Sequence, residues 1–162
     1  MGIAEDLLTL AGHLAAPTNA HPEQAWLRRS ISTAYYALFQ LLVQESAHGW
    51  TGSLATQFGL ERSFKHDQMK EVSRVISTGS WEGWSTPPLD VPPELKDLAT
   101  LFVGLQEARH QADYNNEKTW TQTEATAKLQ DARIAFKHWG KISGSPVADE
   151  YLLSLMIGKK RK

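Results

Sequence analysis

The fold is decided by the stretch between Leu27 and Leu41, which reads Leu-Arg-Arg-Ser-Ile-Ser-Thr-Ala-Tyr-Tyr-Ala-Leu-Phe-Gln-Leu. Its apolar residues recur at steps of three and four, at Leu27, Ile31, Ala34, Leu38 and Leu41. Because this spacing matches the turn of an α-helix, these side chains share one face. The stretch therefore predicts a long helix with a continuous buried stripe.

The same periodicity recurs along the chain, without the alternation of polar and β-branched residues that is typical of strands. Prolines and glycines stand where the periodic segments end. We therefore predict an all-α fold, an up-and-down bundle of four to five main helices plus a short C-terminal helix. The predicted helices span residues 3–16, 22–47, 61–77, 93–114, 121 to about 140, and 145–158.

Two features between these helices carry further predictions. Thr121 stands three residues before Glu124, the spacing of a capping box at the start of a helix. Residues 79–93 hold Trp81, Trp84 and four prolines, and such a segment is expected to form an ordered loop. The two indoles either stack on nucleic-acid bases or pack beneath the loop as a small apolar cluster.

Length and charge narrow the class of protein. The 162 residues fit one domain, with a core at about 3–140, and a short helix and basic tail at 141–162. A net charge of −1 provides no general basic field, so nucleic acid could bind only at a local patch. The tail Lys159–Lys162 is either such a patch for RNA or an acidic partner, or a solvated end.

Several classes of site are excluded by the residues present. The chain has no cysteine, which excludes disulfides, thiolate metal sites and cysteine nucleophiles. The histidines lack metal-ligand spacing and no phosphate-binding loop occurs, so no metal and no cofactor is predicted. The apolar runs are too short to span a bilayer, and the acidic N-terminus is unlike a secretory signal. We expect a cytoplasmic protein with no membrane partner.

One position on the apolar stripe of the 93–114 helix is occupied by a charged residue. After Leu105 the next position on the stripe is Arg109, and Asp113 follows one turn later on the same face. A buried guanidinium needs a partner, because an unpaired buried charge is very unfavourable. Arg109 is either half of a structural ion pair or faces a cleft that takes a phosphate or carboxylate.

Other polar residues stand at positions that suit either packing or function. His66 precedes Met69 by three residues on its helix and is either a boundary residue or a catalytic one. Tyr35 and Tyr36 point about 100° apart, so one can fill the core while the other reaches polar groups. The small residues Ser30, Thr33, Ala34 and Ala37 share a face that permits close helix approach, within the bundle or across a dimer.

Two stretches stand out together. They are Leu27–Phe39, with its run of Arg, Ser, Ala and paired Tyr, and Ala108-Arg109-His110-Gln111-Ala112-Asp113-Tyr114. Together they resemble HEPN domains. The resemblance covers about residues 3–140. It implies a helical homodimer, and many HEPN proteins are metal-independent ribonucleases, toxins or defence effectors. Their catalytic motif is an Arg followed, after four to six residues, by a His, and both copies line a cleft at the dimer interface.

This sequence departs from that motif at the histidine. Arg109 matches the motif's Arg and His110 the polar residue after it, but the expected window reads Tyr114, Asn115, Asn116. A catalytic histidine would have to come from another helix, and His66 is the candidate. In such chemistry an Arg stabilises charge on the phosphorus, while a His moves protons.

Three functions stay open. The first is a dimeric HEPN-like module that binds nucleotide, RNA or a partner protein, such as an antitoxin or nucleotidyltransferase, in a toxin–antitoxin or defence setting. Its cleft would be lined by Arg109, Asp113, Tyr114, His110, Tyr35, Tyr36, Arg29 and His66. The second is a metal-independent endoribonuclease that uses Arg109 with His66 or Tyr114. The third is a structural helical adaptor in which Arg109 and Asp113 form an internal ion pair.

Overall fold

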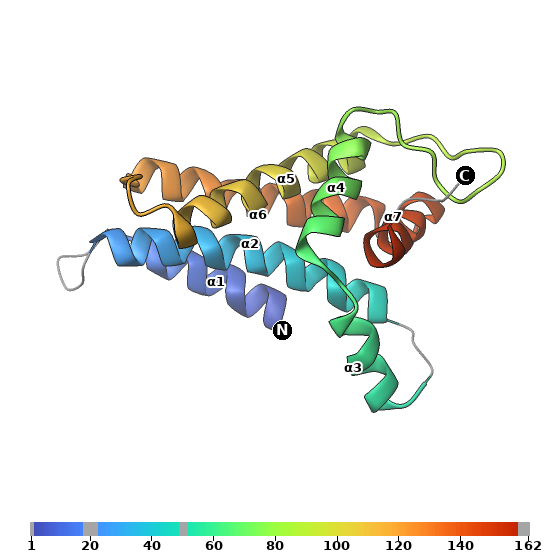
Figure 1. Cartoon of the computed structure of the whole chain (residues 1–162), viewed down its shortest axis with the longest axis horizontal. Helices are drawn as coiled ribbons and strands as arrows, with labels where there is room; N and C mark the ends of the chain where they lie inside the picture. The colour runs from blue at the N-terminus through green and yellow to red at the C-terminus, as the bar shows by residue number, and fades with distance from the viewer. Residues whose placement is uncertain (1, 18–22, 49–51, 159–162) are drawn as a thin grey trace. The chain divides into compact units, whose positions relative to one another are not determined.

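Figure 1 shows a computed structural model of the chain, which describes residues 2–17, 23–48 and 52–158. Within these ranges the chain forms seven helices and no strand. The prediction of an all-α helical bundle is therefore confirmed. The helices are α1 (Ile3–Ala15), α2 (Glu23–Ala47), α3 (Leu54–Arg62), α4 (His66–Ser77), α5 (Pro93–Tyr114), α6 (Gln122–Ile142) and α7 (Pro146–Ile157).

The helix predicted over residues 61–77 is wrong in its first turn, because α3 ends at Arg62 and α4 begins only at His66. Between them Phe64 turns into the core and is buried. Helix α3 itself was not predicted. It buries none of its residues, so no apolar stripe marks it in the sequence. Two predictions lie outside the described residues: the start of the second helix at Pro22 and the role of the tail Lys159–Lys162.

Two helix ends follow their sequence signals. The Thr121 hydroxyl accepts from the Glu124 amide at 3.2 Å, and the Thr121 amide donates to the Glu124 carboxylate at 2.9 Å. The predicted capping box is thus confirmed. Ser145 caps α7 through its side chain, and Gly158 closes that helix with a φ of 85°, a conformation that favours glycine.

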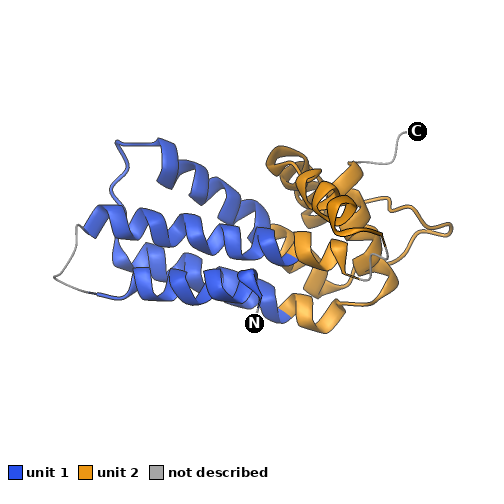
Figure 2. Cartoon of the chain, turned by 90° about the horizontal axis from the view of Figure 1, so that it is seen from below, with its two compact units in different colours: residues 1–41, 101–137 blue, residues 42–100, 138–162 orange. Residues whose placement is uncertain are grey.

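The chain divides into two compact units, coloured separately in Figure 2. The first unit comprises residues 1–41 and 101–137, and the second comprises residues 42–100 and 138–162. Helices α2, α5 and α6 each contribute residues to both. The single domain expected over residues 1–162 stays a prediction.

In the first unit, four helical segments pack side by side: α1, the first part of α2, the last part of α5 and the first part of α6 (Figures 1 and 2). The Ser30 hydroxyl on α2 donates to the Ala11 carbonyl of α1 at 2.9 Å. The small residues Ser30, Thr33, Ala34 and Ala37 are all buried here. Their face is therefore used for close helix approach within the chain.

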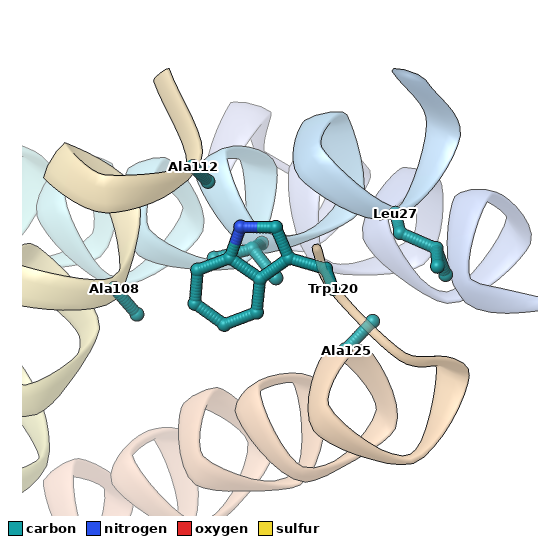
Figure 3. Packing of buried hydrophobic residues seen from close by; sticks show 6 residues of the cluster. Leu27, Ala108, Ala112, Trp120 and Ala125 are labelled. Carbon is teal, nitrogen blue, oxygen red and sulfur yellow. The ribbon is translucent and has the colours of Figure 1, made fainter. Parts of the chain in front are cut away.

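Trp120 fills the end of this unit, between α5 and α6. Figure 3 shows its indole among the apolar side chains of the cluster, which are Leu27, Ile31, Ala108, Ala112 and Ala125. The backbone of Trp120 is held by Gln24 of α2, whose side chain donates to the Trp120 carbonyl and accepts from its amide, at 2.6 and 2.9 Å. Trp120 is 5% exposed. Its buried indole and the two hydrogen bonds from Gln24 together anchor the connection from α5 to α6.

In the second unit, α4 packs against α7. The Gln68 amide donates to the last carbonyls of α7, those of Leu155 and Met156, at 3.0 and 2.6 Å. Deeper in the contact, the hydroxyls of Ser73 and Tyr151 lie 2.9 Å apart and both side chains are fully buried. Burial raises the pKa of the Tyr151 hydroxyl well above its ordinary value, an effect that the Ser73 hydrogen bond partly offsets.

The loop between α4 and α5 is held onto α7 by a buried carboxylate. Glu150 accepts from the backbone amides of Trp84 and Ser85 at 3.2 and 2.6 Å. The Trp84 indole donates to the Ser154 hydroxyl at 3.1 Å. Because its polar edge is already bound within the chain, Trp84 fits a packing role better than a role in base stacking. Of the loop expected over residues 79–93, residues 79–92 form a segment without helix, and Pro93 is the first residue of α5.

Candidate functional site

The candidate site is built around Arg109, on the last part of α5 in the first unit. Its neighbours on the stripe, Leu105 and Ala112, are buried, and Arg109 itself is only 7% exposed. The apolar spacing of the sequence thus placed this guanidinium correctly on the buried face. A cation at such depth is uncommon and needs compensating contacts.

Aromatic rings from α2 cover the guanidinium. Its central carbon lies 5.3 Å from the ring centroid of Tyr35 and 5.6 Å from that of Tyr36. Both distances are within the range of cation–π attraction. Tyr35 is fully buried and also packs on Phe102, whereas Tyr36 is half-buried. One tyrosine fills the core and the other reaches toward the surface, as their 100° separation predicts.

The carboxylate of Asp113, which pairs with Arg109, also binds a second side chain. Asp113 Oδ2 lies 3.8 Å from the Arg109 guanidinium, beyond hydrogen-bond length. Its other oxygen, Oδ1, accepts a hydrogen bond from the Ser32 hydroxyl of α2. The i,i+4 pair therefore exists as the sequence predicts, but it is long, and Asp113 is anchored to the neighbouring helix.

The Arg109 Nε group is buried, and no acceptor for it lies within the described ranges. A buried donor left without a partner costs about 1–3 kcal/mol, and more when it is charged. An anion that entered beside Tyr36 would supply this acceptor and neutralise the charge. The arrangement is suited to binding a phosphate or carboxylate, since a guanidinium matches their geometry with its fork of donors.

His110 and Tyr114 lie on the adjacent, outward face of α5. Their rings lie in contact at a tilt of 51°, with centroids 5.1 Å apart, and Tyr114 is 67% exposed. Arg29 of α2 is also exposed. These three residues border the first unit at its surface and do not share the buried cluster of Arg109.

His66 is the first residue of α4 and is half-buried in the second unit. Its convergence with Arg109, which the ribonuclease hypothesis requires, stays a prediction.

Sequence reasoning missed Ser32 and Arg28. Ser32 is 1% exposed. Arg28 donates to the carbonyls of Ala112, in the last turn of α5, and of Asn115 and Lys118, which follow that helix. The signal was their spacing, because residues 28, 32, 35 and 36 lie on one face of α2. That whole face is turned toward the end of α5 that carries Arg109.

Within the described part of the chain, no group of three or more His, Cys, Asp or Glu side chains could hold a metal ion. No helix there is both long and apolar enough to cross a membrane. Comparison of the chain with family models, with curated proteins and with solved structures finds no match.

Proposed function

We propose that the chain is a HEPN-like module that binds the phosphate group of an RNA or a nucleotide at Arg109. The observation that carries the proposal is the guanidinium itself. It is nearly fully buried, its Nε has no acceptor among the described residues, and its ion pair with Asp113 is 3.8 Å long. A carboxylate of a partner protein would meet the same donors.

The resemblance to HEPN domains extends this proposal to a homodimer that works in a toxin–antitoxin or defence setting, with an antitoxin or nucleotidyltransferase as partner. These parts of the proposal rest on the two motifs around Tyr35 and Arg109. The small-residue face of α2 gives the dimer no support, because its side chains are buried within the chain.

Metal-independent cleavage of RNA is the alternative within the same proposal. Arg109 would stabilise charge on the phosphorus, and His66 or Tyr114 would transfer protons. Tyr114 is exposed at the end of the same helix, one position beyond Asp113.

The test is binding of a fluorescently labelled single-stranded RNA and of labelled ATP, measured by anisotropy at fixed salt. Arg109→Ala should weaken binding about tenfold or more, since a charge-assisted contact to phosphate is lost. Arg109→Lys should recover only part of the affinity, because it keeps the charge but not the fork of donors. Arg133→Ala, at an exposed arginine of the same unit, should bind as the wild type does.

The same samples decide between the three functions. RNA cleavage in EDTA that vanishes in Arg109→Ala would establish the ribonuclease, and His66→Ala would be the next variant. Binding without cleavage would establish the module. If Arg109→Ala lowers the melting temperature but binds RNA and ATP as the wild type does, Arg109 is structural and the proposal is wrong. A sizing column run on each sample tests the dimer.

A further inference from the structure

The second unit contains a pocket of about 290 Å³ that the proposed site at Arg109 does not include. One wall is a single face of α7, since Asp149, Leu152, Leu153 and Met156 follow the i, i+3, i+4, i+7 spacing. The last turn of α2, His48 just after it and Leu60 of α3 complete the lining. This volume is at the lower end of the range for small-molecule sites.

The lining combines two kinds of chemistry. The side chains of Leu60, Leu152 and Met156 give the pocket an apolar wall, although it opens to solvent. Apolar surface that lines a concavity gains free energy when a hydrocarbon displaces water from it. An apolar ligand group of modest size therefore fits this wall.

Two carboxylates, those of Glu45 and Asp149, line the same pocket. Glu45 accepts from the Ser143 hydroxyl at 3.3 Å. Neither carboxylate forms an ion pair with a cation of the chain, as far as residues 2–17, 23–48 and 52–158 show. Their charge is therefore complementary to a cation from outside, and like-charge repulsion disfavours an anionic ligand.

We propose that this pocket binds a small organic cation with an apolar body, an alkylammonium compound. Its hydrocarbon chain packs on Leu60, Leu152 and Met156. Its ammonium group lies near the carboxylates of Glu45 and Asp149 and donates hydrogen bonds to them. Neither an aliphatic acid nor an aliphatic alcohol of equal length satisfies both halves of the pocket.

The test titrates the full chain with hexylammonium, butylammonium, hexanoate and hexanol, and follows binding by shifts of backbone amide signals in NMR spectra. Hexylammonium should bind more tightly than butylammonium, by about fourfold for each added methylene that leaves water. Hexanol should bind more weakly than hexylammonium, and hexanoate more weakly still. The signals that shift should be those of α7 and of the last turn of α2.

Two pairs of variants locate the site. Neutralising Glu45 and Asp149 together, as Gln and Asn, should weaken hexylammonium binding at least fivefold. The control neutralises two exposed acids of the same unit, Glu82→Gln with Asp90→Asn, and should change nothing. Leu153→Lys places a cation in the pocket and should abolish binding. Ile157→Lys, one turn further along α7 and outside the lining, should not.

Equal binding of hexanol, hexanoate and hexylammonium would overturn the proposal, because the carboxylates would then select nothing. So would unchanged affinity in the Glu45/Asp149 variant, or amide shifts scattered over the surface of the chain. Binding of RNA at Arg109 is measured separately, so either proposal can fail while the other stands.

Discussion

Replacing Gly83 with alanine should destabilise the protein mainly through its contact with Glu150. A Cβ atom at this position would lie 1.9 Å from Glu150 Oε2, far inside van der Waals distance. The backbone of Gly83 has no positive φ that would itself oppose alanine. A lesser contact is with the edge of the Trp81 ring, at 3.3 Å, so most of the effect should come from displacement of the Glu150 carboxylate.

The size of the effect follows from what Glu150 holds. Its carboxylate accepts from the backbone amides of Trp84 and Ser85, and Glu150 is 8% exposed. Each hydrogen bond to a charged group contributes about 1.5–3 kcal/mol. Both bonds are only partly buried, so we expect Gly83→Ala to lower the free energy of unfolding by about 2–4 kcal/mol.

The assay is urea denaturation of the full chain as a double-mutant cycle with Glu150→Ala. That variant loses the same two hydrogen bonds, so it should also cost about 2–4 kcal/mol. Once the carboxylate is gone, the methyl group at position 83 has only the edge of the Trp81 ring beside it, at 3.3 Å, and a shift of a few tenths of an ångström relieves that contact. The double variant should then be about as stable as Glu150→Ala alone, and the two effects should not add.

Gly140→Ala is the matched control. Gly140 lies within α6, and no atom stands within 4 Å of where its Cβ would be. Alanine should there stabilise the helix by up to about 1 kcal/mol. If Gly83→Ala leaves stability unchanged, or if its effect adds fully to that of Glu150→Ala, the carboxylate does not hold the loop as described.

Two further predictions concern buried polar contacts. Tyr151→Phe should lower stability by about 1 kcal/mol at neutral pH, because the Ser73 hydroxyl loses its partner. Burial raises the pKa of Tyr151, so the folded chain holds this proton more tightly than the unfolded chain does. The free energy of unfolding of the wild type should therefore fall as the pH rises above about 10. Urea denaturation in alkaline buffer should show a shallower fall for Tyr151→Phe, which lacks the titrating hydroxyl. Arg28→Ala removes the donors to three carbonyls, one in the last turn of α5 and two just after it, and should lower the free energy of unfolding by about 2–3 kcal/mol in urea denaturation. The exposed Arg29→Ala should stay within about 0.5 kcal/mol of the wild type, and equal losses in both variants would contradict the role of Arg28.

Helix α3 shows where prediction from the sequence failed. A periodic apolar stripe reports burial on one face, and α3 buries none of its residues. Its only local signal was Ser53, whose side chain accepts from the Thr56 amide and begins the helix. Where burial does not accompany a helix, the sequence loses its main indicator of that helix.

The candidate site was predictable only in part. The burial of Arg109 and its pairing with Asp113 follow from spacing within one helix. The roles of Ser32 and Tyr36 depend on how α2 turns toward α5, which no spacing within either helix determines. His110 and Tyr114 were placed in the same cleft by the resemblance to HEPN domains. Both are exposed, since a step of one residue from Arg109 or Asp113 rotates a side chain by about 100° to another face, and their part in the site stays a prediction.

By itself, the sequence determined the all-α class, most helix boundaries, the cap at Thr121 and the burial of a cation at Arg109. Each of these depends on residues within a few positions of one another, since helical periodicity and capping are local. Only the tertiary structure decided that Glu150 holds the loop at Gly83 and that Gln24 orders Trp120. It also decided that the small residues of α2 pack within the chain. These contacts join residues far apart in the sequence, and their geometry is set by how whole helices pack.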